Sequence, residues 1–241
     1  MKLRIDAASS IGGRPSQDDC LLIGERPVES PPAHTVPPIF VDVDTGHPPL
    51  LAVLDGVSCC SCASLGSALA ASTIQSSFYA EDWFSDGNNR SELVIQKLNN
   101  ACLDAAAKLA LWNQSFSGSI QAATTITAAA FSEQQLHLWA TGDSPAYLYR
   151  KHTLRPLFET MNDGNRLLAF AGGPNTDFIT STYDLEAGDT VVLLTDGILR
   201  PKMLLLALRL GLSAQAIVRL STTLKPYADN ATLIKIDVVE V

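Results

Sequence analysis

The sequence predicts an α+β domain whose sheets are antiparallel. Strand-like apolar runs gather in two blocks, one before residue 55 and one after residue 121, and two long helical segments lie between them. Two shorter helical segments and a final strand complete the chain. A length of 241 residues fits one large domain with a sizeable core. We therefore expect a single domain over residues 1–241.

The first block opens with residues 3–9, in which apolar side chains alternate as they do in a half-buried strand. A glycine-rich loop at residues 10–19 leads to a second strand at residues 20–23. The proline-rich loop at residues 25–49 predicts an irregular surface excursion with one strand at residues 39–43. Residues 50–54 form a short, continuous apolar run between prolines and a glycine, which predicts a buried strand.

Two long helices are predicted next. Small and apolar residues recur at helical spacing over residues 64–79, which indicates a closely packed helix. A polar break follows at residues 85–90, and Ser91 is suited to cap a second helix whose apolar face extends to Leu111. Residues 114–119 then form a polar loop.

The second block supplies the remaining strands, beginning with a hairpin. Residues 158–177 contain two clusters of glycine and asparagine and predict an irregular region with a short helix. The other predicted elements are strands at 122–131, 136–141, 146–150 and 190–195, helices at 204–210 and 214–224, a connection at 226–228 and a last strand at 231–239.

Charge and hydropathy exclude several classes of protein. The net charge is −8, and no cluster of Lys and Arg provides a contact surface for nucleic acid. No apolar stretch is long enough to cross a bilayer, and residues 1–6 lack the apolar region of a secretory signal. We expect a cytoplasmic protein that binds neither nucleic acid nor membrane.

The chain contains five cysteines, an odd number without a disulfide framework, which suits a reducing compartment. Cys59, Cys60 and Cys62 lie close together, so a thiolate metal site, a redox switch and a structural role are all open. No second Cys or His pair stands at zinc-site spacing, which favours the structural role.

Aspartates stand at the ends of four predicted strands. Each one alone is consistent with an ordinary turn. Hard divalent cations prefer oxygen ligands, and several carboxylates brought together without a cation repel one another. The candidate cation ligands are the four strand-end aspartates and two more in the glycine-rich loop: Asp55, Asp143, Asp196, Asp229, Asp18 and Asp19.

Arg14 precedes two of these acids in the glycine-rich loop. A guanidinium group binds phosphate through two parallel hydrogen bonds. Arg14 is therefore a candidate anion-binding residue beside a metal site, although a solvated loop charge is the simpler alternative.

Six short motifs together resemble the signature blocks of the metal-dependent protein phosphatases of the protein phosphatase 2C type. They follow one another in the same order and at similar spacing, over nearly the whole chain. They are Arg-Pro-Ser-Gln-Asp-Asp at 14–19, Val-Leu-Asp-Gly at 53–56, Ala-Thr-Thr at 123–125, Thr-Gly-Asp-Ser at 141–144, Leu-Thr-Asp-Gly at 194–197 and Asp-Asn-Ala-Thr at 229–232.

The resemblance implies a four-layer sandwich of two antiparallel sheets flanked by helix pairs, with two Mn²⁺ or Mg²⁺ ions at one edge and a third, weaker ion in some members. It implies that Asp55 bridges both ions, that the Gly56 carbonyl is a further ligand, and that Asp196 and Asp229 hold the second ion. Asp19 would be a ligand directly or through water. Asp18 stands where the family usually has glutamate, Asp143 matches the ligand of the third ion, and Arg14 matches the phosphate-binding arginine.

These expectations amount to a serine/threonine phosphatase in signal transduction. Two divalent ions about 4 Å apart lower the pKa of a bridging water and neutralise charge on a phosphoryl group. None of the cysteines lies in the pattern of a cysteine-based phosphatase. The expected partners are a phosphorylated protein substrate and a serine/threonine kinase or its targets, and the expected state is a monomer.

The chain departs from the family pattern in three places. Residues 57–62 replace the usual glycines and histidine, Pro145 replaces a common arginine, and the flap region at about 151–184 is short and lacks the usual Asp-His pair. The altered segment after Gly56 and the short flap motivate one alternative, a catalytically weak or inactive, phosphatase-like regulatory or binding protein. A separate alternative is a phosphatase dedicated to one phosphorylated regulator, which only the substrate would distinguish.

Overall fold

The computed structural model describes residues 1–26, 28, 30–44, 47–80, 90–116, 120–164, 166–224 and 229–241. Predicted features at residues 85–89, 117–119, 165 and 226–228 lie outside the described residues. No helix in the described part of the chain is both long and apolar enough to cross a membrane.

One sheet has six strands, and every neighbouring pair in it is antiparallel. The first and last strands of the chain lie side by side at its centre, with Ile5 opposite Ile236. The strand order is β3 (Ala33–Asp42), β1 (Lys2–Ser10), β13 (Ala231–Glu240), β12 (Thr190–Leu194), β7 (Ala146–Arg150) and β8 (Thr153–Pro156).

The second sheet has five strands and is also antiparallel throughout. Its order is β11 (Ile179–Asp184), β6 (Gln135–Thr141), β5 (Ile126–Ser132), β4 (Leu50–Asp55) and β2 (Asp19–Ile23). A separate ribbon of two short strands is formed by β9 (Asn162–Asp163) and β10 (Arg166–Leu167).

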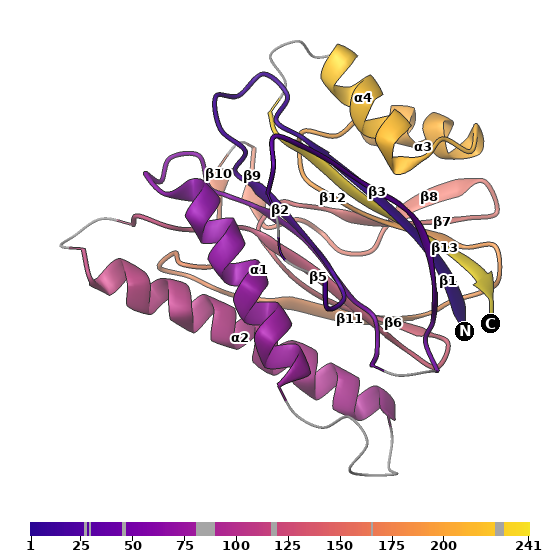
Figure 1. Cartoon of the computed structure of the whole chain (residues 1–241), viewed down its shortest axis with the longest axis horizontal. Helices are drawn as coiled ribbons and strands as arrows, with labels where there is room; N and C mark the ends of the chain where they lie inside the picture. Colours follow the sequence, from indigo (N-terminus) through magenta and orange to yellow (C-terminus); the bar gives the residue numbers. More distant parts are fainter. Residues whose placement is uncertain are drawn as a thin grey trace.

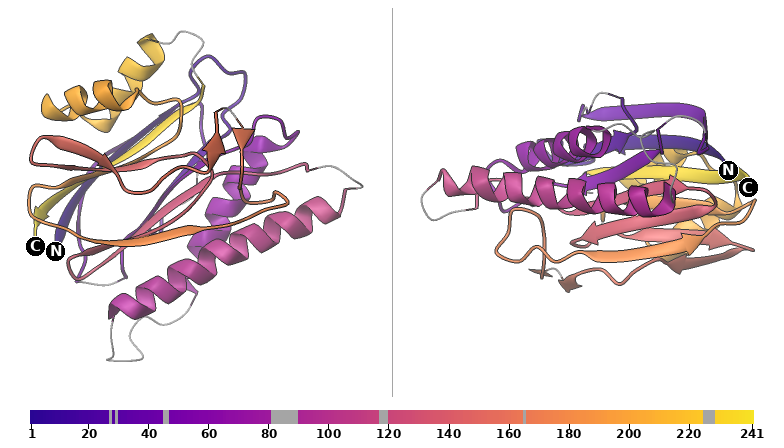
Figure 2. Two further views of the ribbon diagram at one scale, coloured as in Figure 1. Left: turned by 180° about the vertical axis from the view of Figure 1, so that it is seen from behind. Right: turned by 90° about the horizontal axis from the view of Figure 1, so that it is seen from below.

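The two sheets face each other, and each carries a pair of helices on its outer side (Figure 1). Helices α1 (Ala63–Tyr79) and α2 (Arg90–Gln114) cover the five-stranded sheet, and α3 (Pro201–Arg209) and α4 (Ala214–Leu224) lie over the six-stranded sheet. The view from behind shows the same layers, and in the view from below α1 and α2 lie in front of the strands (Figure 2). The predicted four-layer sandwich is confirmed.

Strand β4 illustrates why the buried strands are continuously apolar. Its alternate side chains enter two different cores, because both faces of the sheet are covered. Leu51 and Val53 pack between the sheets, whereas Leu50, Ala52 and Leu54 pack under α1 and α2. A strand covered on both sides has no solvent face on which polar residues would be favoured.

Helix α1 approaches the sheet closely because small residues line its inner side. Gly66 is the clearest case, since a Cβ there would lie 2.8 Å from the backbone of Ala123. The strand predicted at 122–131 accordingly begins only at Ile126, while Thr124 forms isolated bridges to Gly56 and Ala171.

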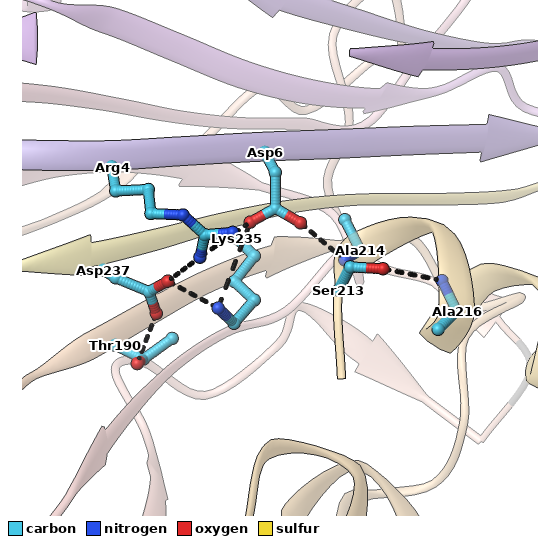
Figure 3. Close-up of polar contacts among 8 residues, drawn as sticks. All are labelled: Arg4, Asp6, Thr190, Ser213, Ala214, Ala216, Lys235 and Asp237. Carbon is cyan, nitrogen blue, oxygen red and sulfur yellow. Dashed lines mark hydrogen bonds and ion pairs between the residues drawn. The ribbon is translucent and has the colours of Figure 1, made fainter. Parts of the chain in front are cut away.

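A buried charge network attaches α4 to the six-stranded sheet (Figure 3). Asp6 of β1 is 3% exposed, and its carboxylate accepts a hydrogen bond from the backbone N–H of Ala214 at the start of α4 (2.7 Å). Lys235 of β13 lies 3.9 Å from Asp6 and 2.5 Å from Asp237. Arg4 pairs with Asp237 at 2.8 Å. Asp6 thus joins a helix terminus to charges on two adjacent strands.

The structure differs from the sequence-based prediction in several segments. The described residues of 158–177 contain no helix, and the β9–β10 ribbon occupies part of this region. Strand β3 starts at Ala33 rather than at 39, because pairing with β1 extends it, and prolines are tolerated on an edge strand. Strands β8 and β11 were not predicted, and α3 begins at Pro201, whose fixed φ suits the first turn of a helix.

Candidate functional site

Antiparallel pairing brings distant aspartates to one edge of the sandwich. Asp19 begins β2 and Asp55 ends β4, and the two are direct partners in the strand register. Asp196 follows the end of β12, and Asp229 precedes the start of β13, which pairs with β12. Because the end of one antiparallel strand lies beside the start of the next, all four residues lie at the same edge.

A cavity of about 480 Å³ opens at this edge. Four aspartates line it together with one arginine and three apolar side chains, so its wall is partly acidic and partly apolar. The lining residues are Asp55, Gly56, Val57, Ser58, Cys59, Thr125, Asp143, Arg166, Leu167, Phe170, Asp196 and Asp229.

Asp19 lies behind this cavity and is 1% exposed. The hydroxyl of Thr195 donates a hydrogen bond to its Oδ2 (2.8 Å), whereas its Oδ1 is buried without a hydrogen-bond partner among the described residues. Burial raises the pKa of Asp19 to about 7, and the charges of Asp196 and Asp229 act in the same direction. A buried carboxylate with one free oxygen is suited to bind a cation.

Asp55 is held at the cavity by its backbone. Its N–H donates to Thr125 Oγ1 (3.0 Å), and its carbonyl accepts the Thr124 hydroxyl (2.9 Å). Burial raises the pKa of the Asp55 carboxyl well above its usual range, and the negative charges of Asp19 and Asp196 raise it further. The mutual repulsion of these acids is a direct electrostatic cost that a cation would relieve.

The glycine after each of two strand-end aspartates lies where no side chain fits. A Cβ on Gly56 would lie 2.5 Å from the carbonyl oxygen of Ala63, and one on Gly197 would lie 2.0 Å from that of Asn230. The Asp-Gly pairs therefore reflect close approach of the backbone in addition to turn formation.

Arg14 forms an ion pair with Asp229 and does not line the cavity. The hydrogen bond to Asp229, reinforced by the charge of that carboxylate, raises the pKa of the Arg14 guanidinium. The Arg14 side chain is 42% exposed, so it can exchange this partner for another anion. The structure thus places the predicted phosphate-binding residue against one of the predicted metal ligands.

The other two candidate ligands, Asp143 and Asp18, are placed differently from each other. Asp143 lines the cavity, and burial raises the pKa of its carboxyl. Asp18 is half-buried and does not line the cavity; its Oδ1 accepts the Ser16 hydroxyl (3.1 Å). The carbonyl of Asp18 accepts the N–H of Gly56 (3.1 Å), so its backbone supports the site.

Asn230 is a site residue to which the sequence analysis gave no role. Its Oδ1 accepts the N–H of Asp18 (2.7 Å), and its Nδ2 donates to the carbonyls of Ile11 and Ser16 (both 2.9 Å). These bonds hold both sides of the loop that carries Arg14. The only signal in the sequence is the position of Asn230 between Asp229 and the last strand.

Arg166 and Phe170 were also missed, because they come from a region predicted to be irregular. They extend the cavity wall beyond the sheet edge, together with Leu167 of β10. Their contribution depends on how the β9–β10 ribbon folds back over the site, which no local pattern indicates.

The donor chemistry fits hard divalent cations. Four carboxylates line one cavity, and a fifth, on Asp19, has an unpartnered buried oxygen. In the part of the chain that the structure describes, however, no three His, Cys, Asp or Glu side chains are already arranged to hold an ion. Binding would therefore require side-chain rotation, including the release of Asp229 from Arg14.

The cysteines do not form a disulfide. Cys59 is exposed and lines the cavity, while Cys60 and Cys62 are half-buried. Burial raises the pKa of the Cys60 thiol to about 11, which leaves it protonated at neutral pH. Cys62 immediately precedes α1, so residues 59–62 connect the cavity wall to this helix.

The chain is similar to proteins of one enzyme family. A family model described as protein phosphatase 2C matches residues 40–232. No curated protein sequence matches the chain.

Solved structures show the same fold. The Mycobacterium tuberculosis serine/threonine phosphatase PstP/Ppp has a TM-score of 0.76 at 19% identity, with 100% of both chains covered. A PstP catalytic domain in complex with two manganese ions has a TM-score of 0.72 at 21% identity, again with 100% of both chains covered. PppA, a regulatory component of T6SS in Pseudomonas aeruginosa, has a TM-score of 0.75 at 16% identity over 98% of this chain and 97% of that one.

Proposed function

Because this chain belongs to the protein phosphatase 2C family of serine/threonine protein phosphatases, we propose that it hydrolyses phosphoserine and phosphothreonine with the help of two Mn²⁺ or Mg²⁺ ions. Its substrates are phosphorylated proteins, with a serine/threonine kinase or the targets of such a kinase as partners. The manganese-bound PstP relative supports the choice of metal.

The observation that carries the proposal is the gathering of Asp55, Asp196 and Asp229 around one cavity. In this proposal Asp55 would contribute to both ions, the Gly56 carbonyl would be a ligand of one of them, and Asp196 and Asp229 would hold the other. Asp19 would act directly or through water. Its unpartnered buried oxygen supports this assignment.

The two remaining acids have subsidiary roles in the proposal. Asp143 would hold a third, weaker ion, since it also lines the cavity. Asp18 would contribute its backbone carbonyl to the support of Gly56, with its carboxylate as a peripheral ligand.

The side chains of the site bind and orient the substrate. When bound, the ions would activate water and neutralise charge on the phosphoryl group. Arg14 would release Asp229 and bind the phosphate instead, since a guanidinium group binds a carboxylate or a phosphate through parallel hydrogen bonds. The same exchange frees the Asp229 carboxylate. Val57, Leu167 and Phe170 would exclude water from one side of the phosphate ester.

The test is hydrolysis of a phosphothreonine peptide and of a generic aryl phosphate by the purified chain. Activity should require added Mn²⁺ or Mg²⁺ and should be abolished by EDTA. Asp55→Asn and Asp196→Asn should each lower kcat/KM by about 1,000-fold, because each removes a ligand charge where the reaction occurs. Asp177→Asn, which changes an exposed acid that does not line the cavity, is the matched control.

The alternative is a regulatory protein that binds phosphopeptides without releasing phosphate. The ion pair between Arg14 and Asp229, together with the lack of a preformed metal group among the described residues, favours it. Phosphopeptide binding by a folded, Mn²⁺-loaded protein that releases no phosphate from either substrate would establish this alternative and refute hydrolysis.

A further inference from the structure

Helix α3 has apolar side chains that are exposed and do not pack in the core. Leu204, Ala207 and Leu208 pack toward the six-stranded sheet and are at most 6% exposed. On its other side, Met203 and Leu206 are 41% and 49% exposed, and Leu210, the C-cap residue directly after the helix, is 67% exposed. Positions i, i+3 and i+7 lie on one face of a helix, so these three form a continuous apolar stripe. We call them the α3 stripe.

Basic residues are frequent in α3 and in the segments on either side of it. Residues 198–224 contain Arg200, Lys202, Arg209 and Arg219 and no acidic residue. All four are exposed, and none of them forms an ion pair with another described residue. Arg209 is held against the β7–β8 turn by a hydrogen bond to the carbonyl of His152 (2.8 Å).

The segment 198–224 carries only basic charges, whereas the rest of the chain has an excess of acidic ones. Of 17 basic and 25 acidic side chains, four basic ones lie in this segment, which leaves 13 basic against 25 acidic elsewhere. An apolar stripe flanked by uncompensated positive charge is complementary to a segment that is both apolar and acidic.

We propose that α3 is a docking surface for an acidic amphipathic segment of a partner protein. The apolar side chains of that segment would cover Met203, Leu206 and Leu210. Its carboxylates would pair with Lys202 and Arg209 beside the stripe.

An anionic membrane fits this surface less well than a peptide does. A bilayer plane would bring the remaining acidic surface of the molecule close to anionic lipids, whereas a peptide covers α3 alone. The stripe is also short, because α3 has only nine residues. A second copy of the chain would oppose two basic faces if the contact were symmetric.

The α3 stripe lies close along the chain to two aspartates of the cavity. Asp196 precedes α3 by five residues, and Asp229 follows the end of α4 by five. Ile198 and Leu199, which lie between Asp196 and α3, are buried in the core beneath the helix pair. A partner on α3 would therefore lie beside the chain segment that carries a cavity aspartate.

The test uses a fluorescent helical peptide of about 14 residues with leucine at every third or fourth position and glutamate elsewhere. Fluorescence anisotropy with the full chain should show saturable binding that weakens about tenfold between about 50 mM and 500 mM salt. Two matched peptides, one with lysine for glutamate and one with serine for leucine, should bind at least tenfold more weakly.

The variants Met203→Ser/Leu206→Ser/Leu210→Ser and Lys202→Glu/Arg209→Glu should each weaken binding of the acidic peptide about tenfold or more. Leu103→Ser/Leu111→Ser, which changes exposed leucines of α2, is the matched control and should bind like the parent. All substituted side chains are exposed, and unchanged circular dichroism and thermal unfolding should verify that each variant is folded.

Four outcomes would overturn the proposal. The first is that the acidic peptide shows no saturable binding, and the second is that the lysine peptide binds as tightly as the acidic one. The third is that the α2 control variant loses as much affinity for the acidic peptide as the α3 variants do. The fourth is that the chain binds phosphatidylglycerol vesicles but not the peptide. The last outcome would assign the surface to a membrane instead. None of these measurements uses phosphatase activity, so the result is independent of the proposed reaction.

Discussion

Asp19 is surrounded by hydroxyl and amide groups and not by a counter-charge. Thr195 donates to its carboxylate and also accepts the N–H of Thr232 (3.0 Å). The hydroxyl groups of Thr232 and Ser9 lie 2.7 Å apart, and Gln17 donates to Ser9 (2.9 Å). These hydrogen bonds orient the carboxylate but supply no positive charge, so burial still dominates its pKa. A bound cation would supply the positive charge that this network lacks.

Arg14 provides the sharpest prediction at the residue scale. Arg14→Ala should lower kcat/KM by about 100-fold, because a charge-assisted contact to the phosphoryl group is lost. Arg14→Lys should recover only part of this loss, since an ammonium group cannot bind phosphate through two parallel bonds. Steady-state kinetics at saturating Mn²⁺ measures both values.

The same variants test the other role of Arg14. If Arg14 serves only to restrain Asp229, Arg14→Ala should shift the Mn²⁺ concentration for half-maximal activity and leave the KM for phosphopeptide unchanged. That result would contradict phosphate binding by Arg14. Stability should change by no more than about 0.5 kcal/mol, because the Arg14 side chain is largely exposed.

At the scale of elements, the strands position the acids and the helix pairs hold the strands. The α3–α4 pair occupies the chain between Asp196 and Asp229, so its attachment to the six-stranded sheet affects both residues. That attachment combines an apolar core with the buried carboxylate of Asp6, which meets the first N–H of α4 and lies near Lys235 (Figure 3). A helix N-terminus favours such a negative charge.

Asp6→Ala should destabilise the protein by about 2–4 kcal/mol, because it removes the helix contact and weakens the charge compensation of buried Lys235. Asp6→Leu combined with Lys235→Met should recover part of the loss, since apolar side chains can replace a buried ion pair. Urea denaturation followed by circular dichroism measures these changes.

Asp177→Ala is the control for the Asp6 variants, because Asp177 is exposed and lies outside the network. A loss of less than about 0.5 kcal/mol for Asp6→Ala would show that the network adds nothing to the apolar contacts.

At the scale of the whole molecule, two sheets bury one core between them, and each helix pair closes a further core. Polar groups inside these layers must be satisfied by one another. His137 of β6 is fully buried, with its ring nitrogens 2.7 Å from Ser132 Oγ and 3.1 Å from Thr182 Oγ1. Burial lowers the pKa of His137 to about 4, because the charged ring would lose its hydration.

This pKa predicts a dependence of global stability on pH. Between the ordinary histidine pKa of about 6.5 and the folded value, the unfolded chain binds more protons than the folded one, so stability falls as the pH is lowered. His137 should account for a loss of about 2 kcal/mol between about pH 7 and pH 4.5.

His137→Gln isolates this contribution, because glutamine retains hydrogen bonding without titrating in this range. The difference in unfolding free energy between parent and variant, measured by urea denaturation, should shrink or reverse as the pH falls. A difference that does not change with pH would contradict the assignment. Comparing the two proteins at each pH cancels the titration of the cavity carboxylates.

The local patterns of the sequence determined most elements and the composition of the site. Continuous apolar runs identified the buried strands, and the periodicity of small residues identified α1. The short motifs identified the family, which the family model confirms over residues 40–232. The metal roles of the aspartates stay a prediction, although the structure brings Asp55, Asp143, Asp196 and Asp229 to one cavity.

Only the tertiary structure decided what depends on partners distant in the sequence. Pairing with β1 set the length of β3, and folding of the β9–β10 ribbon brought Arg166 to the cavity wall. The contact between Arg14 and Asp229 joins residues that are 215 positions apart. Hydropathy and turn patterns report the preference of a segment for its own conformation, whereas register, ion pairing and cavity shape arise from surfaces that meet only after the chain has folded.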